Sequence, residues 1–181
     1  MKNHIRLLEA IAFAAEKHRY QRRKDADATP YINHVIAVAT VLAEEGNVTD
    51  EELLLAAILH DTVEDTDTTF AELEERFGPA IAGLVREVTD DKSLGKEERK
   101  ERQVQHAPAA SDRAKQLKIA DKICNVRDIM HHPPSHWELE RRQEYLRWST
   151  RVVAGCRGIN PLLDRAYDAA AEKAGRHLGM S

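Results

Sequence analysis

The sequence has only two cysteines and no long apolar segment, and both absences limit the kind of protein it encodes. Cys124 and Cys156 are too few for a disulfide framework or a paired-cysteine zinc motif, so we predict two buried thiols in a reducing compartment. The longest apolar run, residues 53–59, falls well short of the ~20 residues that a membrane span requires. The N-terminal stretch MKNHIRLLEA lacks the apolar block of a signal peptide. We therefore expect a soluble, cytoplasmic protein without a membrane partner.

An excess of positive charge is absent as well. The formal net charge of -4 at pH 7 argues against a nucleic-acid partner held by phosphate contacts. It still allows a local basic pocket for a small anionic ligand. No internal repeat, low-complexity tract or change of composition divides the chain. With 181 residues, of which 42% are hydrophobic, we predict that residues 1–181 form one domain around one core.

Alternating strand patterns are missing too, whereas helix signals occur along most of the chain. We therefore predict an all-α fold of roughly eight to ten helices. Capping boxes, in which a hydroxyl and a later glutamate serve each other's backbone N–H groups, mark helix starts at residues 49–52, 69–72 and 135–138. A fourth start lies at Asn160-Pro161, and three glycines mark helix ends: Gly46, Gly78 and Gly158. The remaining patterns predict loops at residues 21–29 and 89–95 and a solvated helix face at residues 96–102.

One short stretch, ILHDTVEDT at residues 58–66, passes directly from an apolar run into a cluster of ionisable groups. If the preceding helix runs on through this stretch, Ala57, His60 and Glu64 lie on one face, which becomes polar at His60. Burying a histidine beside carboxylates costs free energy unless the groups are paired or hold a metal. The alternative interpretation is a helix end that has reached solvent and continues as an acidic turn.

Two further polar residues interrupt apolar helix faces. His34, in YINHVIAVATVLAEEG, lies in the first turn of an amphipathic helix, whose inward face we predict to be Ile36, Val38, Val41 and Leu42. Asp121 lies in the middle of a predicted helix, where an aspartate has poor helix propensity. Its stripe is otherwise apolar and consists of Ala114, Leu117 and Cys124. A lone histidine in such a position is more often a satisfied core or boundary residue, whereas the aspartate requires an explanation. A divalent ion with open positions for water would explain all of these intrusions together: His34, His60, Asp61 and Asp121.

This order, a histidine, then a His-Asp doublet, then a distant aspartate, resembles the metal signature of the HD phosphohydrolases. Segments along nearly the whole chain are similar to those of the small alarmone hydrolases, the Mesh-type single-domain homologues of the SpoT/RelA hydrolase: QRRKD, TPYINHVIAVA, ILHDTVEDTDTT, EVTDDKSL, HAPAASDRAKQLKIADKICNVRDI and PPSHWELERRQEYLRWSTRVVAGCRG. The resemblance implies an α-helical HD-domain bundle that uses Mn²⁺ to hydrolyse (p)ppGpp to GDP or GTP plus pyrophosphate. No room remains for the synthetase, TGS and ACT regions of the long relatives, so we expect degradation of the alarmone without synthesis.

The resemblance also implies roles for individual residues. The metal ligands correspond to His34, His60, Asp61 and Asp121. The pair placed at the catalytic water corresponds to Glu64 and Asp65. Positions near the guanine, ribose and phosphates correspond to Arg23, Lys24, Lys92, Asn125 and Tyr145. The sequence departs from the pattern at Val35, where relatives often have proline, and we expect this to affect the helix start more than the ligand.

Several conspicuous residues are predicted to have structural roles and no part in the metal or nucleotide site. His131 and His132, which precede two prolines, are predicted to end a helix at a rigid turn. Three large apolar side chains are predicted to pack between helices: Trp137, Leu146 and Trp148. Without the family pattern, QRRKD would be interpreted as a solvated loop.

Two other functions stay open at the level of the sequence. An enzyme of the same fold acting on another nucleotide, such as NADPH, would have the same metal residues and would differ only in its pocket loops. A non-catalytic alarmone sensor would keep the fold, but binding alone does not require the water-activating Glu64-Asp65 pair. The sequence leaves open the oligomeric state and the preference between ppGpp and pppGpp.

Overall fold

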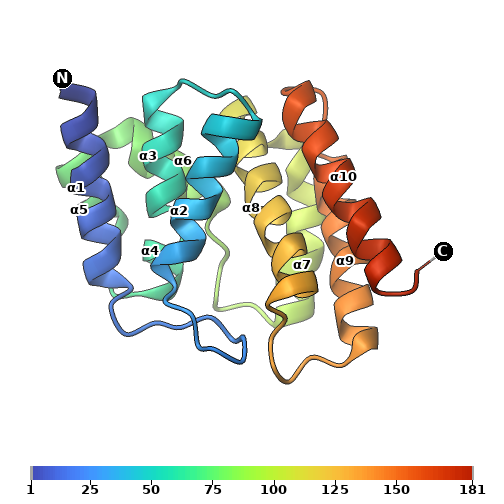
Figure 1. The fold of residues 1–181 in the computed structure, drawn as a ribbon. Coiled ribbons are helices and arrows are strands. Elements are labelled where there is room, and N and C mark those ends of the chain that lie inside the picture. Colours follow the sequence, from blue (N-terminus) through green and yellow to red (C-terminus); the bar gives the residue numbers. More distant parts are fainter. Residues whose placement is uncertain (1, 181) are drawn as a thin grey trace.

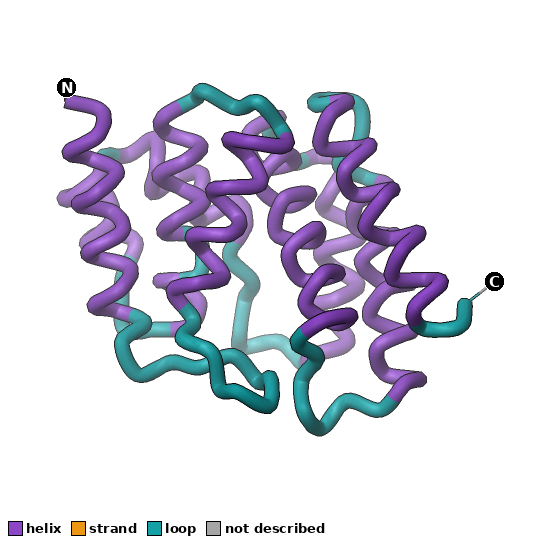
Figure 2. The backbone as a smooth tube through the Cα atoms, viewed as in Figure 1, coloured by secondary structure: helices purple, strands orange, loops and turns teal. Residues whose placement is uncertain are grey.

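The computed structural model describes residues 2–180 and is built from helices joined by loops (Figures 1 and 2). The α-helices are α1 (Lys2–Lys17), α2 (Ile32–Thr40), α3 (Glu51–Leu59), α4 (Thr62–Asp65), α5 (Phe70–Phe77), α6 (Pro79–Val88), α7 (Lys96–His106), α8 (Asp112–His131), α9 (Leu139–Ala154) and α10 (Pro161–His177). A π-helical segment, η1 (Val41–Glu45), extends α2, and a 3₁₀ turn, η2 (Ala107–Ala109), follows α7. The predicted all-α fold is confirmed.

Helix α8 runs through the middle of the molecule, with α2, α3 and α6 on one side and α9 and α10 on the other (Figure 1). The apolar run at residues 53–59 lies in α3, which packs against α1, α2 and α6. Six of its seven residues are buried: Leu53, Leu55, Ala56, Ala57, Ile58 and Leu59. None of the described helices combines the length and apolarity needed to cross a membrane. Cys124 and Cys156 are buried and free, as predicted.

Two of the four predicted helix starts are confirmed. The Thr69 hydroxyl accepts a hydrogen bond from the Glu72 N–H at 3.1 Å, and the Asn160 side chain caps α10 with Pro161 at its first position. The start predicted at Thr49 is wrong by one residue. There the cap is Asp50, whose carboxylate accepts from two backbone N–H groups and carries the negative charge that a helix N-terminus favours.

The start predicted at Ser135 is wrong, because α9 begins only at Leu139. The backbone N–H of Ser135 instead donates to the carbonyl of Lys24 at 2.8 Å. This bond ties the α8–α9 loop to the α1–α2 loop, and the two loops lie side by side along one edge of the molecule (Figures 1 and 2). A contact between residues this far apart in the chain cannot be seen in a local capping pattern.

The predicted helix ends are confirmed at Gly46 and at Gly78, where φ is +92°. Helix α9, however, ends at Ala154 and not at Gly158, which lies in the following turn, also with φ +92°. The inward face of α2 was also partly mispredicted, since Ile36 is 38% exposed and Val35 is buried in its place. Val35 and Val38 share the side of α2 that meets α3 and α8.

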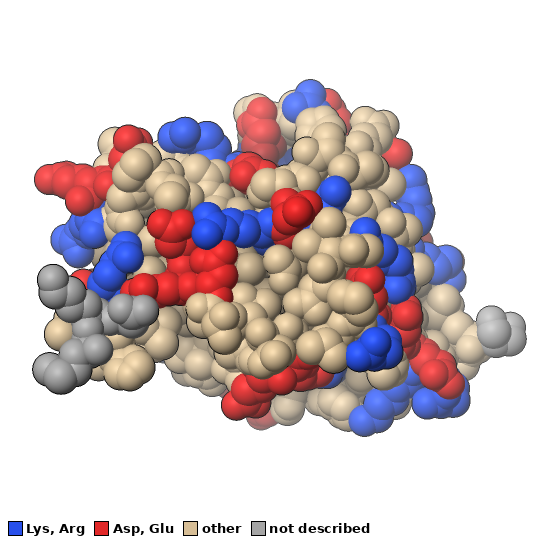
Figure 3. Space-filling view, turned by 90° about the horizontal axis from the view of Figure 1, so that it is seen from above, with Lys and Arg blue, Asp and Glu red and all other residues tan. Residues whose placement is uncertain are grey.

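The loops at residues 21–29 and 89–95 and the solvated face of α7 are confirmed. Among the described residues, the loop after α1 carries the single isolated β-bridge, between Arg22 and Pro30. Basic and acidic side chains are interspersed on the face shown in Figure 3, and the described residues drawn there form no continuous basic patch.

The end of α9 packs against η2 so closely that only glycine fits at position 155. A Cβ atom on Gly155 would lie 2.8 Å from the Ala107 Cβ and 2.9 Å from the Pro108 Cδ. We therefore expect Gly155→Ala to lower the free energy of unfolding by about 1–3 kcal/mol, the usual cost of overpacking. The matched control is Gly83→Ala in α6, where no atom lies within 4 Å and the gain in helix propensity should stabilise the fold. Urea unfolding measures both, and equal stability of Gly155→Ala and the wild type would contradict this prediction.

Candidate active site

His60 and Asp61 lie in a tight turn, not inside a continuous helix as the sequence interpretation assumed. Helix α3 ends at Leu59, and α4 starts at Thr62. At this turn, side chains form hydrogen bonds with the backbone carbonyls at the end of α3. The Thr62 hydroxyl donates to the Leu59 carbonyl at 2.7 Å, and His60 Nδ1 lies 2.8 Å from the Ala57 carbonyl. Because a carbonyl can only accept, Nδ1 carries a hydrogen, and Nε2 becomes free to bind a metal once it loses its proton.

The other histidine comes from the first turn of α2. His34 is buried, and its Nε2 atom lies 3.1 Å from Asp121 Oδ1 and 3.8 Å from Asp61 Oδ2. Tyr31, one turn earlier, donates from its hydroxyl to Asp61 Oδ2 at 2.7 Å. The start of α2 therefore supplies both an imidazole and a phenol that orients the Asp61 carboxylate.

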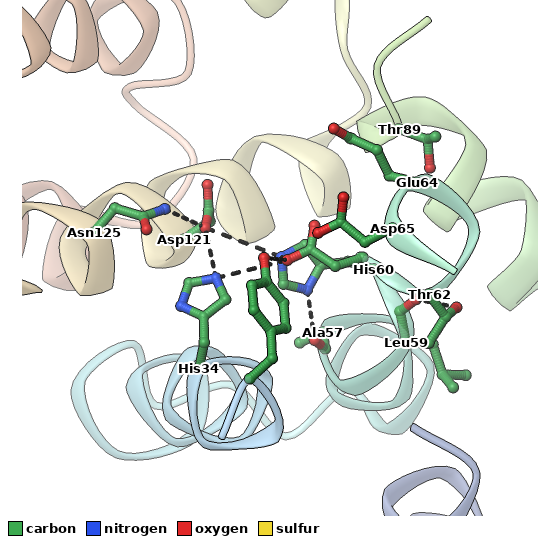
Figure 4. A network of polar contacts seen from close by, with 12 residues as sticks. His34, Ala57, Leu59, His60, Thr62, Glu64, Asp65, Thr89, Asp121 and Asn125 are labelled. Atoms are coloured by element: carbon green, nitrogen blue, oxygen red, sulfur yellow. Dashed lines mark hydrogen bonds and ion pairs between the residues drawn. The ribbon is translucent and has the colours of Figure 1, made fainter. Parts of the chain in front are cut away.

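Asp121 projects from the middle of α8 toward the two histidines (Figure 4). Its Oδ1 atom accepts from Asn125 Nδ2 at 2.6 Å, and its Oδ2 atom accepts from Lys122 Nζ at 3.0 Å. Lys122 is itself buried, with its ammonium 4.6 Å from the centre of the Trp148 ring. The carboxylate is thus held in place by its own helix, which accounts for an aspartate in mid-helix.

The four predicted metal ligands converge on one point from three separate elements (Figure 4). They are His34 from α2, His60 and Asp61 from the turn after α3, and Asp121 from α8. One ligand atom from each of His34, His60 and Asp121 lies within 4.8 Å of the others, and His60 Nε2 lies 3.1 Å from Asp61 Oδ2. Two imidazole nitrogens and two carboxylates form a mixed nitrogen and oxygen donor set that fits a divalent transition metal. The sequence interpretation brought the same four residues together.

The electrostatics of the cluster also fit a cation. Burial works against protonation of His60, but the charges of Asp61 and Asp121 outweigh it and raise its pKa to about 9. Burial by itself would raise the pKa of Asp61, yet the imidazoles of His60 and His34 hold it well below its usual range. The carboxylates therefore need positive charge beside them, which a bound metal supplies while releasing the histidine proton.

Glu64 and Asp65 follow in α4 and face different sides. Glu64 shares a cavity of about 160 Å³ with the four donor residues, and its Oε2 atom accepts from the Asp90 N–H at 3.1 Å. We call this the carboxylate cavity. Burial and the neighbouring carboxylates raise the pKa of Glu64 to about 7. Asp65 instead accepts from Lys92 Nζ at 2.6 Å and from Gln21 Nε2 at 2.8 Å.

A second pocket, of about 310 Å³, adjoins the carboxylate cavity, because Tyr31 and Asn125 line both. We call it the Arg23 pocket. The Arg23 guanidinium donates to Asp128 Oδ2 at 2.5 Å and to Asn125 Oδ1 at 3.1 Å, and it lies 5.5 Å from the centre of the Tyr31 ring. The other predicted residues that line this pocket are Lys24, Asp65, Asn125 and Tyr145.

Lys92 is placed differently from the other predicted residues. It lines neither the Arg23 pocket nor the carboxylate cavity, and its half-exposed side chain pairs with Asp65. Contact between Lys92 and a ligand therefore stays a prediction.

The residues interpreted as structural have the expected positions. His131 ends α8 and His132 follows it, Leu146 is buried, and Trp148 packs against the core. Trp137 also packs against the core, but it lines the Arg23 pocket as well.

Sequence reasoning missed several residues that position the site: Gln21, Tyr31, Lys122 and Asp128. Tyr31 carried a signal, because it precedes His34 by three residues and so shares its helix face. Lys122 carried one as well, as a lysine beside Asp121 in a helix that is otherwise rich in buried apolar residues. Gln21 and Asp128 are ordinary loop and helix-surface residues in the sequence, and only the tertiary fold brings them to the site.

Comparison with known proteins places the chain in a family. A model of the HD domain family matches residues 10–147. The chain is 56% identical over 158 residues to the Danio rerio protein guanosine-3′,5′-bis(diphosphate) 3′-pyrophosphohydrolase MESH1, covering 87% of this chain and 88% of that one. The Homo sapiens protein of the same name is 54% identical over 160 residues, with coverage of 88% and 89%.

A solved structure gives a further match. It is described as a metazoan ortholog of SpoT that hydrolyzes ppGpp, and it superposes on this chain with a TM-score of 0.91 at 50% identity. The match covers 94% of this chain and 96% of that one. The resemblance drawn from the sequence segments is confirmed. The chain belongs to the HD domain family and, within it, to the MESH1 group.

Proposed function

We propose that this protein hydrolyses the alarmone (p)ppGpp at its 3′-diphosphate, giving GDP or GTP plus pyrophosphate. The observation that carries the proposal is the continuity of the site: the donor cluster and Glu64 share a cavity that adjoins the Arg23 pocket. A ligand with a purine at one end and a phosphate ester at the other can reach both. The activity named for the Danio rerio and Homo sapiens relatives supports the same substrate.

We propose Mn²⁺ as the ion, held by His34, His60, Asp61 and Asp121. When bound, such an ion lowers the pKa of water and polarises a phosphate oxygen. The remaining chemistry belongs to the chain. Glu64, which has a raised pKa of about 7, accepts the proton of the attacking water, because a base poised near the working pH transfers protons most effectively.

Asp65 has a positioning role in this proposal. Both of its oxygens accept hydrogen bonds, from Lys92 and Gln21, so the carboxylate is fixed between two loops and its charge is partly balanced. Asp65 thereby holds α4, and with it Glu64, in position. It also fixes the part of the Arg23 pocket that it lines. Arg23, Lys24, Asn125 and Tyr145 bind the guanosine end, and Lys92 reaches a phosphate by exchanging its contact with Asp65.

The test is incubation of the pure protein with Mn²⁺ and ppGpp, with release of pyrophosphate as the readout. A parallel panel contains pppGpp and NADPH, the latter followed by release of orthophosphate. Pyrophosphate release from ppGpp at a higher kcat/KM than any reaction with NADPH is the expected result. Turnover of NADPH alone would reassign the substrate and leave the metal site standing.

Arg23→Ala is expected to raise the KM for ppGpp roughly tenfold while changing kcat less, since stacking on the base is the same in the ground and transition states. Arg23→Lys should recover little, because the ammonium keeps the charge without the planar face. Steady-state kinetics at saturating Mn²⁺ measures both variants. The matched control is Arg19→Ala, which removes an exposed arginine paired with Glu16. Full rescue by lysine would assign Arg23 to phosphate charge, and unchanged kinetics in Arg23→Ala would remove it from the site.

A further inference from the structure

One cationic side chain that lines the carboxylate cavity, Lys118, has no role in the proposed hydrolysis. Lys118 lies on α8 one turn before Lys122 and lines the carboxylate cavity together with Glu64 and Asp121. Lys122 is committed to Asp121 at 3.0 Å. Lys118, by contrast, is partly buried and makes neither an ion pair nor a side-chain hydrogen bond with any of residues 4–180, whose side chains the structure describes.

An ammonium group in this position is costly for the fold. Burial lowers the pKa of Lys118, and the charge of Lys122 adds to that effect. Asp90, whose carboxylate lines the same cavity, already accepts from Gln103 Nε2 at 2.7 Å. A partly desolvated cation without a carboxylate partner is stabilised when an anion binds beside it.

The geometry of the cavity indicates which anion this is. Tyr31 and Asn125 connect the cavity to the Arg23 pocket at one end. Lys118, Asp90 and Gln103 connect it at another end to a groove of about 480 Å³ between α6, α7 and α8. If the nucleoside fills the Arg23 pocket and the phosphate nearest the ribose meets the donor cluster, the rest of the 3′-diphosphate extends toward Lys118.

We propose that Lys118 forms the subsite for the terminal phosphate of the 3′-diphosphate, a role that rests on the proposed function. The ammonium neutralises part of the charge on this phosphate, and the amide of Gln103 lies in the same wall. Reaction at the phosphorus nearest the ribose forms one P–O bond to the water oxygen, whose proton passes to Glu64, and breaks the bond to the ribose 3′ oxygen. The proton held by Glu64 then passes to that oxygen, which leaves as the 3′-hydroxyl of the nucleotide product. The pyrophosphate product then keeps its terminal phosphate at Lys118.

The test compares Lys118→Met with the wild type, since methionine keeps an unbranched side chain of similar length and removes the charge. Binding of inorganic pyrophosphate and of GDP to the Mn²⁺-loaded proteins is measured by calorimetry. Loss of a charge-assisted contact should weaken pyrophosphate binding about tenfold or more, with GDP affinity unchanged. Lys118→Arg should retain most of the affinity. The matched control is Lys115→Met, on the same helix but outside the cavity and the groove.

Two results would overturn the proposal: equal pyrophosphate affinity in the wild type and Lys118→Met, or equal weakening of pyrophosphate and GDP. The second would assign Lys118 to the support of the fold, which thermal unfolding of the variant would also show. The proposed function is tested separately by turnover of ppGpp in the wild type. Wild-type protein that binds pyrophosphate through Lys118 but leaves ppGpp intact would contradict the function and not the anion site.

Discussion

Replacing His60 with alanine should abolish both the retention of Mn²⁺ and the hydrolysis of ppGpp. The side chain supplies one of two imidazole nitrogens to the donor cluster, and its Nε2 atom lies 3.1 Å from Asp61 Oδ2. Without it, the partly buried carboxylates of Asp61 and Asp121 face each other with less positive charge between them. The site also has one ligand fewer, which lowers its affinity for the metal. Elemental analysis after dialysis and a pyrophosphate-release assay measure the two losses.

Asp61→Asn should give the same result by a different change, since the amide keeps the shape of the side chain and removes its charge. The control is His131→Ala, which removes an exposed histidine at the end of α8 and should leave metal content and turnover unchanged. Normal Mn²⁺ content in His60→Ala would show that the ligand assignment is wrong. Loss of turnover with normal metal content would move His60 from the metal to the substrate.

Local signals in the sequence were sufficient for much of the fold. Caps such as Thr69 and Asn160 bond to N–H groups two or three residues further along, so the local sequence is sufficient to predict them. The burial of α3 follows from its unbroken apolar run. Asp121 could be identified because a carboxylate on an apolar stripe needs a partner, and the structure supplies Lys122, Asn125 and His34.

Three features could not be predicted from the sequence: the turn at His60, the start of α9 and the position of Lys92. The turn at His60 depends on hydrogen bonds from the side chains of His60 and Thr62 to two backbone carbonyls. The spacing of apolar residues in the sequence does not predict these bonds. The late start of α9 depends on the bond between Ser135 and Lys24. Lys92 was assigned from its motif to the group of residues near the nucleotide, and its contact with Asp65 requires two segments distant in the chain to meet.

Glu64→Gln should lower kcat by about 10²-fold or more while leaving metal content and fold unchanged. The glutamine carbonyl oxygen can still accept from the Asp90 N–H, which holds the wild-type carboxylate at 3.1 Å, so the loop keeps its position. What is lost is the proton acceptor. Asp65→Asn should cost less, because Asp65 only positions its neighbours through Lys92 and Gln21. Stopped-time assays of pyrophosphate release at saturating ppGpp compare the variants.

The pH profile separates a proton acceptor from a group that only binds. Burial and nearby carboxylates raise the pKa of Glu64 to about 7, and the active form is the carboxylate above that pKa. Turnover by the wild type should therefore fall as the pH drops below about 7, and a bound cation, which favours the carboxylate, moves this midpoint lower. In Glu64→Gln the midpoint should disappear and leave a low, flat rate across the same range. A wild-type midpoint that persists in Glu64→Gln would assign the acidic limb of the profile to another group and remove Glu64 from proton transfer.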